Sequence, residues 1–224
     1  AAQNGHLETL KWARQNGCPG YMKAVEAATR GNHIECVRWL CAHDMGHVNA
    51  RSLQWAAVRG NLEMIKLQHS FGAMADNQCV YEAARHGHLD CLQYFVAHGY
   101  SLFDFHILMD AAVSTPHMNL DLVRWILEIF DTDEWEEVIG MQHPFSAQSI
   151  ESAAETGYIE VLELARQRGC WGGAFTENAC GAAAEGDQLE TLKWLRKHGC
   201  EWNENTCELA ARCDAFESLK WLRE

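Results

Sequence analysis

Apolar and polar positions recur along the 224-residue chain in one fixed order, eight times over. An apolar residue is followed directly by an acidic one, an aliphatic residue comes two positions after the acid, and a bulky residue comes two positions later. Leu7, Glu8, Leu10 and Trp12 are the first such set. Apolar residues spaced three and then two apart make a stripe along one side of a short helix. The pattern therefore predicts eight short helices, each with one apolar face.

A pair of alanines precedes each of these helices and divides the chain into units. The pairs begin at Ala1, Ala27, Ala56, Ala83, Ala111, Ala153, Ala183 and Ala210. Their spacings are 26, 29, 27, 28, 42, 30 and 27 residues. Small side chains allow close packing, so each pair predicts an earlier, shorter helix. Two such helices cannot bury their apolar surface alone, and neighbouring units are therefore expected to stack.

Glycines separate the predicted helices at two kinds of position. Those that follow the second helix suit a left-handed C-cap, and they are Gly17, Gly72, Gly99, Gly169 and Gly199. Those between the two helices suit a tight turn, and they are Gly5, Gly31, Gly60, Gly87 and Gly157. No segment reads as a strand, so the predicted fold class is all-α.

The units resemble ankyrin repeats. The stretch from Ala1 to Glu8, continued through Gly17-Cys18, matches that family's pattern without a gap. Most units here have 26–30 residues, whereas the family's unit has about 33. The missing residues fall after the Gly-Cys step, where the family extends a β-hairpin. The resemblance implies an α-solenoid of about eight helix-turn-helix repeats with shortened hairpins, and short Trp-rich units of this kind are similar to those of giant DNA viruses and protists.

The resemblance covers residues 1–224 as a single array. Because the chain begins inside a first helix and ends inside a second, we expect a fragment of a longer array with incomplete terminal repeats. One unit, at about 111–152, carries an insertion. The acidic part of this insertion consists of Asp133, Glu134, Trp135, Glu136 and Glu137. It could dock a basic peptide, or it could simply be a solvated loop. Asp131 and Asp133 also suggest a calcium loop, but no glycine stands at the turn position that such a loop needs.

The recurring acid and the bulky residue have structural interpretations. A carboxylate in the first turn of a helix favours the positive end of the helix dipole. In six units a base follows three residues later, and these bases are Lys11, Arg38, Lys66, Arg124, Lys193 and Lys220. We expect exposed ion pairs there, and we expect the bulky row, which is rich in Trp, to lie in the core between repeats.

Charge is unevenly distributed. The chain has 18 Lys+Arg and 31 Asp+Glu, a formal net charge of −13. Residues 1–112 hold 10 acids and 9 bases, whereas residues 113–224 hold 21 acids and 9 bases. Such acidity argues against binding nucleic-acid phosphates, and no apolar run approaches the roughly 18 residues of a membrane span. The excess in the second half predicts a partner with a basic segment.

The resemblance also implies where a partner would bind. In ankyrin repeats the two residues after the double alanine face a concave groove. Carried over by position, the candidate groove residues are Arg30, Arg59, Arg85, His86, Glu155, Glu185 and Arg212. A groove that is basic at one end and acidic at the other would orient a charged partner segment. The predicted function is a non-catalytic, monomeric scaffold that binds another protein.

Two alternatives remain. In the giant-virus relatives such arrays often follow an F-box segment, which suggests the substrate-recruiting part of a ubiquitin-ligase adaptor. The ten cysteines suggest a metal or redox protein, with Cys36, Cys41, His43 and His47 as the best cluster, but their spacing matches no common set of ligands. We instead expect small buried thiols in a reducing, cytoplasmic compartment. No cofactor, no metal and no catalytic arrangement is predicted.

Overall fold

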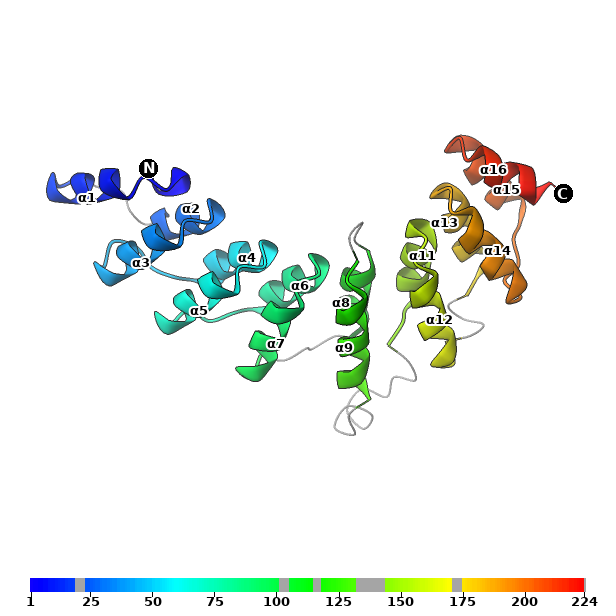
Figure 1. Ribbon diagram of the computed structural model, residues 1–224, viewed down its shortest axis with the longest axis horizontal. Helices are drawn as coiled ribbons and strands as arrows, with labels where there is room; N and C mark the ends of the chain where they lie inside the picture. Colours follow the sequence, from blue (N-terminus) through cyan, green and yellow to red (C-terminus); the bar gives the residue numbers. More distant parts are fainter. Residues whose placement is uncertain (19–22, 101–104, 115–117, 132–143, 171–174, 224) are drawn as a thin grey trace. The chain divides into compact units, whose positions relative to one another are not determined.

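The computed structural model describes residues 1–18, 23–100, 105–114, 118–131, 144–170 and 175–223 (Figure 1). The chain divides into two compact units, Ala1–Phe103 and Asp104–Glu224. That residues 1–224 form a single array remains a prediction. That this array is a fragment of a longer one also remains a prediction.

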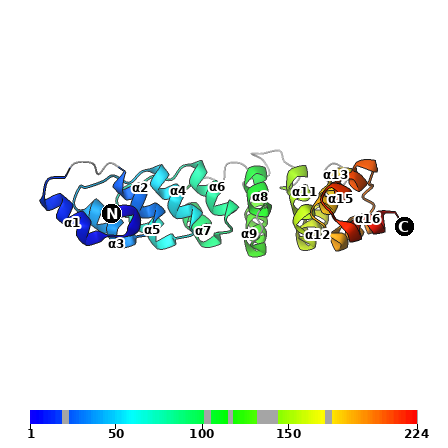
Figure 2. The same cartoon turned by 90° about the horizontal axis from the view of Figure 1, so that it is seen from above.

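The first unit consists of four helix pairs. Its elements are the short 3₁₀-helix η1 (Ala2–Asn4) with α1 (Leu7–Gln15), α2 (Ala24–Arg30) with α3 (Ile34–Ala42), α4 (Ala50–Val58) with α5 (Leu62–Ser70), and α6 (Asn77–Arg85) with α7 (Leu89–Ala97). The first helices pack in the order η1, α2, α4, α6, and the second helices α3, α5 and α7 pack beside one another. The pairs thus stack one beside the next along this unit (Figure 2).

The second unit is built in the same way. Its pairs are α8 (Phe105–Val113) with α9 (Leu120–Phe130), α11 (Ala147–Thr156) with α12 (Ile159–Gln167), α13 (Glu177–Glu185) with α14 (Leu189–Lys197), and α15 (Glu204–Arg212) with α16 (Phe216–Leu222). The first helices pack in the order α8, α11, α13, α15. Over the described ranges every element is helical and none is a strand. The prediction of an all-α fold of about eight helix-turn-helix repeats is confirmed.

The second helices begin at the predicted apolar residues, and the aliphatic position forms the core. Seven of its eight members are buried and Leu219 is half-buried. The bulky row is different: only Leu67 is buried, the others are partly exposed, and Trp12 has 60% of its surface exposed. The prediction that this row lies in the inter-repeat core is therefore wrong.

The double-alanine register is correct in most units but shifts by one residue in α2. There the buried pair is Ala28 and Thr29, and Ala27 is only half-buried. The turn after α2 has three residues, as do the turns after α4 and α6. Its middle residue is Asn32, with φ 63°, which takes the left-handed conformation that Gly60 and Gly87 take in the other two turns. Gly31 has a different role: a Cβ at this position would lie 2.1 Å from the Gln3 carbonyl oxygen.

The predicted helix ends and ion pairs are mostly present. All five glycines after the second helices have positive φ, as a left-handed C-cap requires. Four of the six predicted i,i+3 ion pairs form, namely Lys11–Glu8, Arg38–Glu35, Arg124–Asp121 and Lys193–Glu190. They are exposed, so each contributes only about 0.2–0.5 kcal/mol.

Candidate functional site

The ends of the first helices in the first unit carry a row of exposed arginine and histidine side chains. Arg30 and Arg85 are the last residues of α2 and α6, and Arg59 and His86 are the C-cap residues of α4 and α6. All four are exposed. The packing of α2, α4 and α6 side by side therefore brings these four predicted groove residues onto neighbouring helix ends.

Arg30 bridges three consecutive repeats. Its Nη2 donates a hydrogen bond to Gln3 Oε1 of the preceding repeat at 3.2 Å. Its guanidinium carbon also lies 5.6 Å from the centre of the Trp55 ring in the following repeat. A guanidinium over an indole face is attracted by the ring's negative quadrupole. Arg30 is thus held beside Trp55.

A pocket of about 460 Å³ lies next to Trp55 and is lined by Asn32, Trp55, Val58, Arg59, His86 and His88. We call it the Arg59 pocket. Its residues come from three consecutive repeats, and all but Trp55, which lies within α4, are in turns or at helix ends. Two of them, Arg59 and His86, are predicted groove residues, and Arg30 adjoins the pocket through its contact with Trp55.

Two acceptors at the Arg59 pocket, the Val58 carbonyl oxygen and Asn32 Oδ1, already have donors. His88 Nε2 donates to the Val58 carbonyl oxygen at 3.2 Å, and Asn61 Nδ2 donates to Asn32 Oδ1 at 2.6 Å. The Arg59 guanidinium, in contrast, has only donors, and no ion pair joins it to an acid within the described part of the chain. The pocket therefore presents hydrogen-bond donors to a ligand.

The predicted groove residues of the second unit are also exposed, but they are mainly acidic. Glu155 is the penultimate residue of α11, and Glu185 and Arg212 end α13 and α15. Arg212 Nη2 donates to Glu185 Oε1 at 3.4 Å, which partly neutralises Glu185. No such pair is formed by Glu155 among the residues that the structure describes.

The predicted insertion residues Asp133, Glu134, Trp135, Glu136 and Glu137 lie outside the described residues. Asp131, which precedes them, is described. Its carboxylate accepts a hydrogen bond from the Arg168 guanidinium. This pairing occupies an oxygen that the suggested calcium loop would need.

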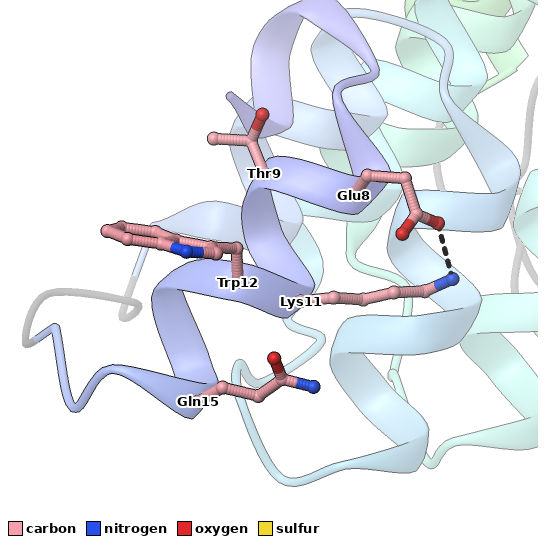
Figure 3. A pocket seen from close by; sticks show the side chains of 5 residues that line it. All are labelled: Glu8, Thr9, Lys11, Trp12 and Gln15. Atoms are coloured by element: carbon pink, nitrogen blue, oxygen red, sulfur yellow. Dashed lines mark hydrogen bonds and ion pairs between the residues drawn. The ribbon is translucent and has the colours of Figure 1, made fainter.

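A second open surface lies on α1 and is a pocket of about 510 Å³ (Figure 3). The Lys11 amine meets the Glu8 carboxylate at 2.6 Å, and the Trp12 indole extends away from this pair. In the next repeat the equivalent residue, Trp39, has the Arg14 guanidinium 6.0 Å from its ring centre. Trp12 is therefore the equivalent of Trp39, whose indole ring in the next repeat contacts a residue of the neighbouring second helix α1.

The cysteines behave as small buried side chains. All ten are free thiols, and six are buried: Cys36, Cys79, Cys91, Cys170, Cys180 and Cys200. Burial raises the pKa of Cys79 and of Cys91 to about 12. A thiol with so high a pKa stays protonated near neutral pH and is a poor nucleophile or metal ligand.

The candidate metal cluster is dispersed in the structure. Cys36 is buried in α3, Cys41 is half-buried five residues further along the same helix, and the His43 ring stacks on Trp39 at 4.9 Å. The described residues contain no group of three or more His, Cys, Asp or Glu side chains placed to hold a metal ion.

Sequence reasoning missed three residues of the Arg59 pocket. Trp55 directly precedes Ala56, but it lies outside the recurring bulky row and was therefore not singled out. Asn32 was missed because the alanine register assigned the turn to Gly31, whereas the left-handed residue of this turn is Asn32. His88 was not among the predicted groove residues, although its ring lines the pocket. An indole one residue before the alanine pair was the signal that could have located the site.

Comparisons with known proteins agree with the fold. Residues 53–96 match the family model of ankyrin repeats (many copies). The crystal structure of the human ASB11 ankyrin repeat domain is similar, with a TM-score of 0.51 and 19% sequence identity, and the match covers 100% of this chain and 96% of that chain. No curated protein matches the chain. Over the described residues, no helix has the length and apolar character needed to cross a membrane.

Proposed function

Since this chain carries ankyrin repeats and has the fold of an ankyrin-repeat domain, we propose that it is a non-catalytic scaffold that binds a partner protein along the ends of its first helices. Ankyrin repeats generally serve protein–protein interaction. The partner's contact residues on this chain would be Arg30, Arg59, Arg85 and His86 in the first unit, and Glu155, Glu185 and Arg212 in the second.

The observation that carries this proposal is the opposite charge of the first helices in the two units. Helices α2, α4 and α6, together with the C-cap Arg59, carry four arginines and two glutamates. Helices α8, α11, α13 and α15 carry seven acids and one arginine. Exposed charges of opposite sign favour a partner with complementary segments and reject one with the reverse order. A basic partner segment would dock on the acidic second unit.

A charge-reversal experiment tests the proposal. The triple variant Arg30→Glu, Arg59→Glu, Arg85→Glu should abolish capture of the partner in a pull-down analysed by mass spectrometry, because it reverses the charge that the partner meets. The matched control is Lys11→Glu, Arg38→Glu, Lys66→Glu, which makes the same charge change on second helices of the same unit. Circular dichroism should show unchanged helix content in both variants.

The control should still capture the partner. Equal capture by the two triple variants and the wild-type protein would show that the ends of the first helices do not bind it. Loss of capture in both variants would show that net charge alone matters.

The proposal places the protein in a reducing, cytoplasmic compartment and treats it as a monomer. Ten free cysteines support the reducing environment, because oxidising compartments favour disulfides. Fractionation of cells that produce the full-length protein, followed by size-exclusion chromatography with light scattering, tests both statements.

A further inference from the structure

We infer that the Arg59 pocket binds carboxylate side chains of an acidic segment in the partner protein. This inference rests on the proposed function and specifies the chemistry of the ligand in the first unit. It concerns glutamate or aspartate side chains that approach Asn32, Trp55, Arg59 and His86.

Hydrogen bonding is the first argument. An ionised carboxylate can only accept hydrogen bonds, and a guanidinium can only donate them. The Val58 carbonyl and Asn32 Oδ1 already accept from His88 and Asn61. A ligand that needed acceptors would compete with these bonds, whereas a carboxylate would use the unpaired donors of Arg59 in a two-pronged contact.

The surrounding charges are the second argument. The Glu26 carboxylate on α2 pairs with Arg51 at 3.2 Å, and the Glu82 carboxylate on α6 lies 3.6 Å from His86 Nε2. Glu82 is outnumbered by the three arginines Arg30, Arg59 and Arg85. Arg30 lies against Trp55 at the pocket, and Arg85 directly precedes the pocket residue His86 in the chain. The uncompensated charge next to the pocket is therefore positive, and it would steer an acidic segment toward Arg59.

The walls of the pocket are the third argument. Trp55 and Val58 supply apolar surface, against which the methylene groups of a glutamate can pack while its carboxylate meets Arg59. A volume of about 460 Å³ exceeds that of one side chain. The occupant is therefore a short peptide segment, and neighbouring carboxylates would contact Arg30 or Arg85.

Peptide binding tests the inference directly. Fluorescein-labelled peptides of alternating Gly and Glu are compared by fluorescence polarisation with matched peptides of alternating Gly and Gln. We expect the Glu peptide to bind the wild-type protein and the Gln peptide to bind at least about tenfold more weakly. Arg59→Gln should weaken Glu-peptide binding about fivefold, because it removes the central charged donor at an exposed site.

A matched control isolates the pocket from general charge. Arg38→Gln removes an exposed arginine from α3 in the same unit, and it should change Glu-peptide affinity less than twofold. Arg59→Lys, which keeps the charge but loses the planar fork, should fall between wild type and Arg59→Gln. In ¹⁵N NMR spectra, the Glu peptide should shift the signals of Asn32, Trp55 and His86.

Other outcomes overturn the inference. Equal binding of the Glu and Gln peptides, or equal losses in Arg59→Gln and Arg38→Gln, would show that the pocket does not recognise carboxylates. Tighter binding of a phosphoserine peptide than of the Glu peptide would assign the pocket to phosphate instead. A protein partner that Arg59→Gln still captures at full strength refutes the pocket and leaves the proposed function standing, whereas failure of the wild-type protein to capture any partner refutes the proposed function.

Discussion

Gln68 shows how a single residue departs from the repeat pattern. It occupies the seventh position of α5, where all the other second helices carry an apolar residue. Gln68 is fully buried and donates to the Thr29 hydroxyl at 3.1 Å, while its Oε1 accepts from the Ser52 hydroxyl. A buried amide needs such partners. The departure was visible in the sequence, but its two partners were not, since they come from α2 and α4.

Thiol reactivity is the first prediction at the residue scale. In the folded protein at pH 8, iodoacetamide should label Cys18 and Cys213 rapidly, because both are exposed, and should label Cys79 and Cys91 hardly at all. Burial raises the pKa of the latter two to about 12, so only a very small fraction of either thiol is ionised at pH 8, which slows their labelling further. Peptide mapping by mass spectrometry measures the four rates.

Labelling in urea is the control for that experiment. Once the chain unfolds, all four thiols should react at similar rates, since an unperturbed cysteine has a pKa near 8.5. Fast labelling of Cys79 or Cys91 in the folded protein would contradict the packing of α6 and α7 described above.

At the scale of an element, a glycine after a helix can be required by its backbone conformation alone or also by contact with the next repeat. Gly17 and Gly60 both have positive φ, 67° and 63°. Among the described residues, a Cβ on Gly17 would meet nothing within 4 Å, whereas a Cβ on Gly60 would lie 2.3 Å from His88 Nδ1. The first glycine is required only by its φ, and the second also by the histidine ring of the following repeat.

This difference gives a prediction for two matched substitutions. Gly17→Ala should lower the free energy of unfolding by about 1 kcal/mol, the typical cost of a non-glycine residue at positive φ. Gly60→Ala should cost at least about 1 kcal/mol more, because the His88 ring must move and its hydrogen bond to Val58 is lost. Urea denaturation followed by circular dichroism measures both. Equal losses of unfolding free energy in the two variants would mean that the His88 ring moves aside without a measurable cost in stability.

At the scale of the whole molecule, the net charge of −13 conceals two surfaces of different sign. The first helices of the first unit are net basic, and those of the second unit are net acidic. Affinity for a partner should therefore depend on the order of charges along the partner's sequence as well as on its total charge.

The acidic surface gives the corresponding prediction. A labelled peptide of alternating Gly and Lys should bind the protein, and Glu155→Gln with Glu185→Gln should weaken that binding about threefold, since two exposed carboxylates are removed. The control, Glu160→Gln with Glu190→Gln, makes the same charge change on second helices of the same unit. Fluorescence polarisation at low and at high salt measures both, and binding should fall with salt. A larger loss in the control would place the basic segment on the second helices.

The sequence alone determined the repeat, the all-α class and the limits of the second helices, because the apolar stripe, the helix-start acid and the capping glycine act within a few residues of one another. Only the tertiary structure decided which residues meet across repeats: the one-residue shift at Ala28 and Thr29, the exposure of Trp12, and the gathering of Asn32, Trp55 and Arg59 around one pocket. These contacts join residues about 25–30 positions apart, and a periodic pattern gives their spacing but not the direction in which each side chain packs.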